Sequence, residues 1–119
     1  QAMQENDLKR YIVVTGLNVD TPKDNKAPKV KFATDWMYQN YPKTTTDRQD
    51  EYELLVKSKA DWTLVRVPMI KLTDESKEIK ISLEDCLGDE ISATDLADFL
   101  IEQINDHTYC REAPFIANS

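Results

Sequence analysis

Two apolar runs dominate this sequence and constrain its fold. The first reads RYIVVTG over residues 10–16, and the second reads DWTLVRVPMI over residues 61–70. Neither run alternates between apolar and polar residues, which is typical of strands buried on both faces of a parallel sheet. Pro68 has no backbone N–H, so it ends the ladder of the second strand. The sequence therefore predicts two buried strands of a parallel sheet.

Two helices are predicted between these runs. Residues 32–42, FATDWMYQNYP, place aromatic residues near helical spacing and end at Pro42, which favours a short helix. Residues 45–59 give a clearer helical pattern, because Thr46 and Gln49 have the spacing of a capping box and an apolar stripe follows them.

The second half of the chain adds one helix and two further strands. Residues 92–104 give the strongest helical pattern, with Ser92 and Asp95 as a cap. Its apolar side is predicted at four positions: Leu96, Phe99, Leu100 and Ile104. Residues 78–85 alternate and predict a half-exposed edge strand, and residues 114–118 predict a short last strand. Strands that alternate with helices favour an α/β fold with parallel pairs.

The beginning of the chain does not fit a complete domain of this class. Residues 1–9 are typical of the end of a helix, and the chain passes from them into a strand predicted to be fully buried, which needs neighbours on both sides. Neither of the two glycines, Gly16 and Gly88, lies in a glycine-rich dinucleotide motif. We therefore expect residues 1–119 to be one domain that forms the second half of a larger unit.

The composition narrows the classes of partner. The net charge of −7 and the pI of about 4.7 disfavour nucleic acid, whose binders need a basic surface. No apolar run approaches the ~20 residues of a membrane span, and the first residues lack the apolar core of a signal peptide. No membrane partner and a cytoplasmic location are therefore expected. Residues 18–30 are predicted as a loop, and the basic cluster at 22–31 is expected to face solvent.

Cys86 and Cys110 are the two cysteines of the chain. Because no CxxC motif occurs and the composition is cytoplasmic in character, two free thiols are expected rather than a disulfide. His107 and Cys110 supply two ligands, which do not make a closed metal site, so no metal is expected.

Three segments resemble the C-terminal half of a known family. They read KRYIVVTGLNV, EYELLVKSKADWTLVRVPMI and ISATDLADFLIEQINDHTYCREAPFIAN. They are similar to the atypical short-chain dehydrogenase/reductase-like proteins, an NAD(P)-binding group that includes NADH-flavin reductases and NmrA-like proteins. The resemblance implies the C-terminal portion of a Rossmann-like doubly wound parallel sheet that lacks its N-terminal glycine-rich half. It also implies NAD or NADP as the cofactor of the intact protein.

The resemblance further implies where the cofactor would lie. The nicotinamide-side wall would consist of six residues at the ends of the two strands: Thr15, Gly16, Leu17, Pro68, Met69 and Ile70. From the residues alone, the opposite interpretation is favoured, in which the proline merely ends the strand and its two successors cover core. The resemblance makes the two interpretations equally open. The resemblance assigns Arg48 to a ribose or phosphate group of the cofactor.

The sequence departs from the classical catalytic pattern of the wider superfamily. There a Tyr-x-x-x-Lys pair handles the substrate proton, and the corresponding positions here hold Thr44 and Arg48. A threonine hydroxyl lacks the acidity of a phenol, and arginine does not release its proton at neutral pH. Tyr38 and Tyr41 lie near as substitutes, although packing is their commoner role. Arg66 is expected to form a structural ion pair, with a substrate contact as the alternative.

Two main functions remain open. In the first, the chain is part of an NAD(P)-dependent, NADH-flavin reductase-like oxidoreductase that transfers hydride from the nicotinamide to a small-molecule acceptor of the flavin or quinone type. In the second, it is a non-catalytic dinucleotide-binding or regulatory module that acts through a protein partner. A small independent interaction domain is a third alternative. The open flank of the first strand also predicts self-association or pairing with the severed N-terminal half.

Overall fold

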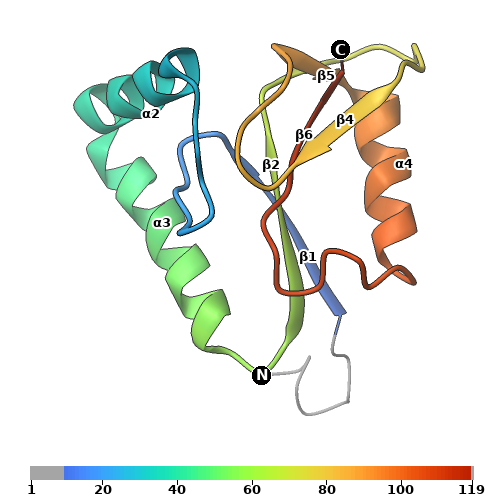
Figure 1. Cartoon of the computed structure of the whole chain (residues 1–119), viewed down its shortest axis with the longest axis horizontal. Helices are drawn as coiled ribbons and strands as arrows, with labels where there is room; N and C mark the ends of the chain where they lie inside the picture. Colours follow the sequence, from blue (N-terminus) through green and yellow to red (C-terminus); the bar gives the residue numbers. More distant parts are fainter. Residues whose placement is uncertain (1–9, 119) are drawn as a thin grey trace.

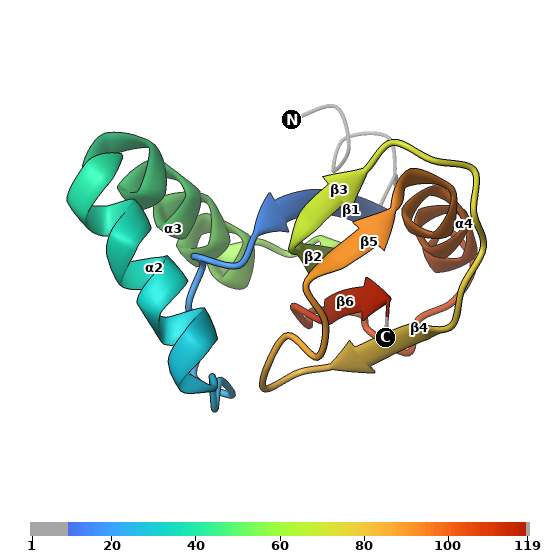
Figure 2. The same ribbon diagram turned by 90° about the horizontal axis from the view of Figure 1, so that it is seen from above.

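A four-stranded sheet separates two layers of helices in the computed structural model, which describes residues 10–118 (Figures 1 and 2). The elements follow in the order β1 (Arg10–Gly16), α2 (Pro28–Asn40), α3 (Pro42–Lys57), β2 (Asp61–Val67), β3 (Met69–Lys71), β4 (Ile79–Ser82), β5 (Glu90–Ser92), α4 (Ala93–Gln103) and β6 (Phe115–Asn118). The helix expected at the start of the chain lies outside the described residues. None of the helices in the described part combines the length and apolar character needed to cross a bilayer.

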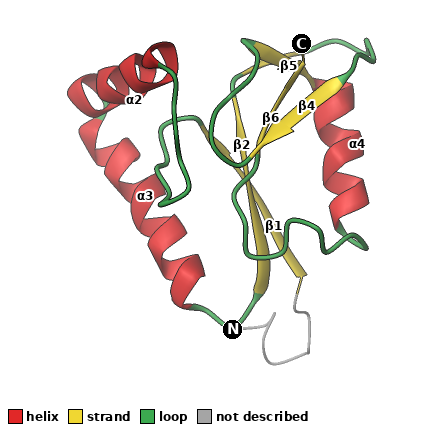
Figure 3. Ribbon diagram, viewed as in Figure 1, coloured by secondary structure: helices red, strands yellow, loops and turns green. Residues whose placement is uncertain are grey.

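The main sheet has the strand order β1-β2-β6-β4. β1 and β2 pair in parallel along their whole length, from Arg10 opposite Asp61 to Gly16 opposite Val67. β6 continues the sheet in parallel beside β2, and β4 closes it as an antiparallel edge strand. The predicted α/β fold with a mainly parallel sheet is confirmed, as is the edge position of residues 79–82 (Figure 3).

The alternating side chains of β2 supply both halves of the core. On one face Trp62, which is 2% exposed, and Leu64 pack with Tyr52 of α3. On the other face Val65 packs in a cluster with Phe99 of α4. Because both faces of β2 are covered by helices, its sequence needs no polar alternation.

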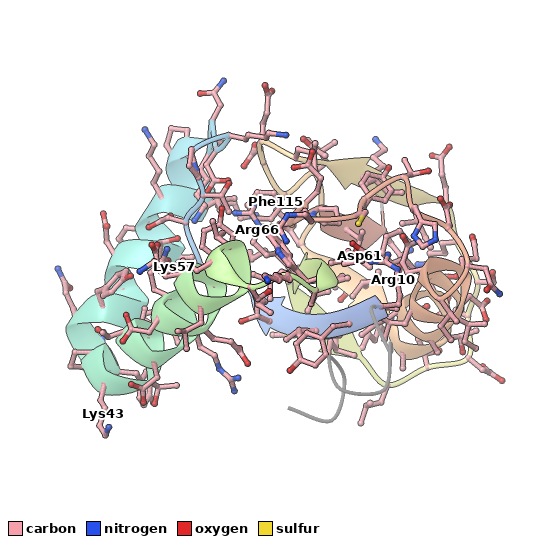
Figure 4. All side chains as sticks on the ribbon, turned by 90° about the horizontal axis from the view of Figure 1, so that it is seen from below. Arg10, Lys43, Lys57, Asp61, Arg66 and Phe115 are labelled. Atoms are coloured by element: carbon pink, nitrogen blue, oxygen red, sulfur yellow. The ribbon has the colours of Figure 1, made fainter. Side chains whose placement is uncertain are left out.

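β1 corrects the prediction of a fully buried first strand. Of its seven residues only Thr15 is buried, and Tyr11 is exposed. Within residues 10–118 β1 pairs with β2 alone, so one of its edges stays open. Arg10 fastens the strand at its start, since its guanidinium donates to the carbonyls of Gln103 at 2.7 Å and Asp61 at 2.8 Å (Figure 4).

Both helices between β1 and β2 begin earlier than predicted. α2 begins at Pro28 and α3 at Pro42, so the predicted loop is wrong over its last three residues. Proline suits the first helical turn because an N–H there has no intrahelical partner. The predicted capping box is also wrong. Thr46 lies inside α3, and Gln49 instead donates to the carbonyl of Asp20 at 2.8 Å.

α4 follows the prediction at its start and departs from it at its end. The hydroxyl of Ser92 accepts from the backbone N–H of Asp95 at 3.0 Å, as expected of a cap. Ile104 lies beyond the last helical residue and is 55% exposed, so it does not belong to the apolar face. The strands β3 and β5 form a separate parallel pair that was not predicted, because three residues are too few to show periodicity.

Candidate functional site

A cleft of about 840 Å³ lies where β1 and β2 end. Leu17 directly follows β1 and Pro68 directly follows β2, and both line it. The remaining lining residues are Ala27, Lys29, Val30, Ala33, Met69, Lys77, Cys86, Leu87, Gly88, Asp89, Glu90 and Asn118. Ligands of open parallel sheets bind beyond the carboxyl ends of strands, and pockets for them measure about 300–1,000 Å³. The cleft has the place and the size of a ligand site.

Two loops form the walls of this cleft. The first, residues 17–27, connects β1 to α2, and the second, residues 83–89, connects β4 to β5 and lines the cleft from Cys86 onward. Gly88 permits the close approach of the second loop to β6, since a Cβ there would lie 2.1 Å from the carbonyl oxygen of Asn118.

The cleft is lined by both apolar and charged side chains. Lys29 of α2 and Asp89 of the second loop form an ion pair at the surface, with both side chains 77% exposed. Cys86 is buried, and its Sγ donates to the carbonyl of Gly88 at 3.2 Å. Burial raises the pKa of this thiol above its ordinary value, so it is protonated at neutral pH and is a weak nucleophile.

The structure brings together half of the six residues predicted for the nicotinamide-side wall. Leu17, Pro68 and Met69 line the cleft. Ile70 does not, because it pairs with Ile91 in the β3–β5 ladder. Thr15 and Gly16 lie at the end of β1 without lining the cleft, and the buried hydroxyl of Thr15 has no hydrogen-bond partner among residues 10–118.

Arg66 forms the structural ion pair that its position in the strand predicts. It is fully buried, and its Nη1 donates to the two carboxylate oxygens of Asp24 at 2.8 and 3.0 Å. Burial lowers the pKa of the guanidinium, while Asp24 opposes this effect. Arg66 is not among the residues that line the cleft, so the alternative of a direct substrate contact gains no support.

Lys26 corrects the prediction of a solvated basic cluster. It is 6% exposed, and its Nζ lies 2.6 Å from Oδ1 of Asp20 and 2.9 Å from the carbonyl oxygen of Leu17. Sequence reasoning missed this residue because three further lysines surround it at positions 23, 29 and 31. Lys23 and Lys29 do lie at the surface, as predicted.

The N-terminus of α4 holds a second polar network beside the cleft. Asp95 is 3% exposed, and its carboxylate accepts from the amide of Asn118 at 2.9 Å and the backbone N–H of Lys77 at 3.0 Å. Burial by itself would raise the pKa of Asp95, but these bonds, with those from Ser92 and Ser76, outweigh it, and the pKa lies below its ordinary value. The network fixes Asn118 and Lys77, which both line the cleft.

The family of the chain follows from a match over most of its length. Residues 1–107 match the model of the family described as NAD(P)H-binding. The chain belongs to this NAD(P)H-binding family. A comparison with curated proteins finds no match.

Several solved structures of NAD(P)-binding and dehydrogenase-like proteins share the fold of this chain at low sequence identity. A Bacillus halodurans protein, provisionally assigned as an NAD-dependent epimerase/dehydratase, gives a TM-score of 0.71 at 15% identity over 98% of this chain and 50% of its own. A short-chain dehydrogenase/reductase from Veillonella parvula in complex with NADP gives 0.65 at 16% over 98% and 54%. A Rossmann-fold NAD(P)-binding family protein from Shigella flexneri gives 0.59 at 20% over 98% and 49%. The chain thus spans about half the length of these structures.

Thr44 and Arg48, which occupy the positions of the classical Tyr and Lys, do not line the cleft. Thr44 and Arg48 lie on α3 beside a smaller hollow that they share with Asp47 and Glu51. Arg48 is 53% exposed at its side chain and lies 3.9 Å from a carboxylate oxygen of Glu51. The structure therefore does not place Arg48 with Leu17, Pro68 and Met69.

Of the two tyrosines offered as substitutes, Tyr38 is a poor acid in this arrangement. Burial raises the pKa of Tyr38, and the nearby carboxylates of Asp20 and Asp50 raise it further. Tyr41 is exposed and packs against Trp36 at a ring-centroid distance of 5.8 Å. Neither tyrosine lines the cleft.

Proposed function

We propose that this chain forms the nicotinamide and acceptor side of an NAD(P)-dependent oxidoreductase of the NADH-flavin reductase kind. The observation that carries the proposal is the cleft at the ends of β1 and β2, whose wall includes Leu17, Pro68 and Met69. Membership of the NAD(P)H-binding family and the fold shared with an NADP-bound short-chain dehydrogenase/reductase support the cofactor class. The cofactor would supply the hydride, and the chain would orient the ring and exclude water.

The lining of the cleft favours an acceptor that needs little help with protons. Among the described lining residues there is no histidine or tyrosine, and the thiol of Cys86 is held protonated. A flavin or a quinone accepts hydride without a protein acid of the phenol type. Such acceptors also suit the apolar wall residues, which would pack against a flat ring.

The second candidate is a non-catalytic module that binds the dinucleotide and signals through a protein partner. The specific observation in its favour is the separation of Thr44 and Arg48 from the cleft, since these positions would carry the acid–base pair of a classical member. Single-turnover oxidation of NADH or NADPH by the intact protein separates the candidates. Binding without oxidation in the presence of flavin and quinone acceptors would favour the module.

The oxidoreductase proposal is tested at Met69, whose side chain is 74% exposed and lines the cleft. We expect Met69→Ala in the intact protein to raise the KM for the reduced nicotinamide roughly tenfold, because one apolar wall contact is lost. Leu72→Ala is the matched control, since Leu72 is 90% exposed, follows the same strand and does not line the cleft. An equal change of KM in the two variants would show that the cleft does not bind the reduced nicotinamide.

We also propose a partner for the open edge of β1, namely a strand of the N-terminal half of the protein. The chain covers about half of the structures described above, and within residues 10–118 the backbone groups along the outer side of the first strand have no partner strand. The cytoplasm is the location we propose, because a nicotinamide reductase with the free thiols Cys86 and Cys110 suits a reducing compartment.

A further inference from the structure

We infer that Arg66 and Lys26, together with Asp24, form a buried clamp that fixes both walls of the cleft and so sets its width. These three residues, called the clamp below, do not line the cleft, so they are positioning residues rather than catalytic ones. The effect on a ligand rests on the proposed function. The effect on the walls does not, and it can be measured without any cofactor.

Arg66 reaches both walls from the middle of the sheet. Its Nη1 donates to the carbonyl of Val19 at 3.0 Å as well as to Asp24, and both acceptors belong to the first wall, residues 17–27. Its Nη2 donates to the carbonyl of Leu83, the first residue of the second wall, at 3.4 Å. The guanidinium carbon lies 3.6 Å from the centre of the Phe115 ring, which holds the planar group in one orientation (Figure 4).

Lys26 holds the backbone of the first wall in place through hydrogen bonds from its buried ammonium group. Its Nζ donates to the carbonyls of Leu17 at 2.9 Å and Val19 at 3.4 Å, and to the hydroxyl of Thr34 in α2 at 3.2 Å. It also lies 3.7 Å from a carboxylate oxygen of Asp24, so that carboxylate faces both buried cations. The ammonium group thereby fixes the backbone of Leu17, the wall residue nearest to β1.

Two further bonds couple the walls to each other. The backbone N–H of Asn25 donates to the carbonyl of Glu84 at 2.8 Å, and the N–H of Ala27 donates to Oδ1 of Asp85 at 3.1 Å. Asn25 directly follows Asp24, and Asp85 directly precedes Cys86. A displacement of the clamp would therefore separate Leu17 and Ala27 from Cys86.

Cys86 is a native reporter of this separation, because it is a buried residue of the second wall and belongs to the core cluster against which Leu17 packs. The test measures the rate of alkylation of Cys86 under native conditions in a Cys110→Ser background. The variants are Lys26→Met, which keeps the length of the stem, and Asp24→Asn, which keeps the shape of the carboxylate. Loss of a cation does not favour the thiolate, so faster alkylation in Lys26→Met reports access.

Phe99→Leu is the control for general destabilisation, because Phe99 lies in the core cluster on the other side of the sheet. We expect alkylation to rise at least tenfold in both clamp variants and to stay within about threefold of the parent in Phe99→Leu at a comparable free energy of unfolding. Equal acceleration in clamp and control variants would overturn the inference. So would a failure of both clamp variants to fold, since the clamp would then serve global stability alone.

The intact enzyme gives a second readout that a purely structural role would not produce. Because the clamp shapes the cleft without lining it, Asp24→Asn should raise the KM for the acceptor several-fold and leave kcat within about twofold. A fall in kcat at unchanged KM would contradict the assignment. If the intact protein shows no reductase activity, the proposed function fails while the alkylation result stands by itself.

Discussion

Asp95 illustrates how a single buried carboxylate can stabilise a loop. It accepts hydrogen bonds from Ser76 and Lys77 of the segment before β4 and from Asn118 of β6. A hydrogen-bonded carboxylate favours its charged form, and each such bond to a charged group contributes about 1.5–3 kcal/mol. The segment that carries Lys77 is thereby fixed to the N-terminus of α4.

The first prediction concerns acid stability. The folded pKa of Asp95 lies below the value of 3.8 that applies without its partners, so its stabilisation is complete above that value and is lost as pH falls through the folded pKa. Asp95→Asn should lower the free energy of unfolding at pH 7 by about 1–3 kcal/mol. It should also reduce the dependence of that free energy on pH between about pH 5 and pH 2.

Urea titrations at several pH values measure this, and Asp98→Asn is the control because Asp98 is exposed on the same helix. A parallel loss in both variants would show that helix charge, rather than the network around Asp95, is responsible.

A second prediction concerns Arg48. Its side chain lies exposed on α3. Arginine side chains bind anionic or ribose groups but do not act as bases near neutral pH. Arg48→Lys in the intact protein should leave the shape of the pH profile of kcat/KM unchanged. A new ionisation on the basic limb of that profile would show that this position takes part in proton transfer.

At the scale of elements, α4 is the helix whose packing the sequence predicts best. Its cap and the buried side chains of Leu96 and Phe99 follow the predicted pattern, and Leu100 packs partly buried against the same cluster. The pattern can be read from a few consecutive residues, because apolar residues at helical spacing mark the face of the helix that packs against the sheet.

Phe99→Ala should lower the free energy of unfolding by roughly 3–5 kcal/mol, since it removes a ring that is 4% exposed. Ile101→Ala, on the exposed side of α4, is the control and should cost less than about 0.5 kcal/mol. Chemical denaturation in urea measures both. A loss below about 1 kcal/mol for Phe99→Ala would mean that α4 does not cover the core.

At the scale of the whole molecule, two predictions follow from the chain being about half as long as the structures it matches: one on dinucleotide affinity and one on the open edge of β1. Affinity in this fold rests on a glycine-rich turn and a helix N-terminus that hold the pyrophosphate, and residues 1–119 contain no such glycine motif. The remaining contacts are those of the cleft. We therefore expect the chain by itself to bind NADH and NADPH no more tightly than about millimolar.

The same chain should self-associate through β1, or pair with the N-terminal half when that is supplied. Calorimetry with both dinucleotides, together with a molar-mass measurement by light scattering, tests the two parts separately. Micromolar binding by a monomer would show that residues 1–119 hold a complete site.

The sequence by itself determined the order of the main elements, because their signals are local. The uninterrupted apolar runs at β1 and β2, the cap of α4 at Ser92 and the proline that ends β2 each act within a few residues. The six-residue wall, by contrast, was implied by the family resemblance, and three of its members, Leu17, Pro68 and Met69, line the cleft.

Only the tertiary structure decided the rest, because it depends on contacts between distant segments. Lys26 stands among lysines that face solvent, and its burial follows from the carbonyls of a loop folded around it. An arginine in the middle of a buried strand predicts a carboxylate partner. The sequence does not say which carboxylate, because 42 positions separate Arg66 from Asp24 and local sequence patterns do not extend that far. The exposure of β1 likewise depends on which strands are present beside it, a property of the sheet rather than of the strand.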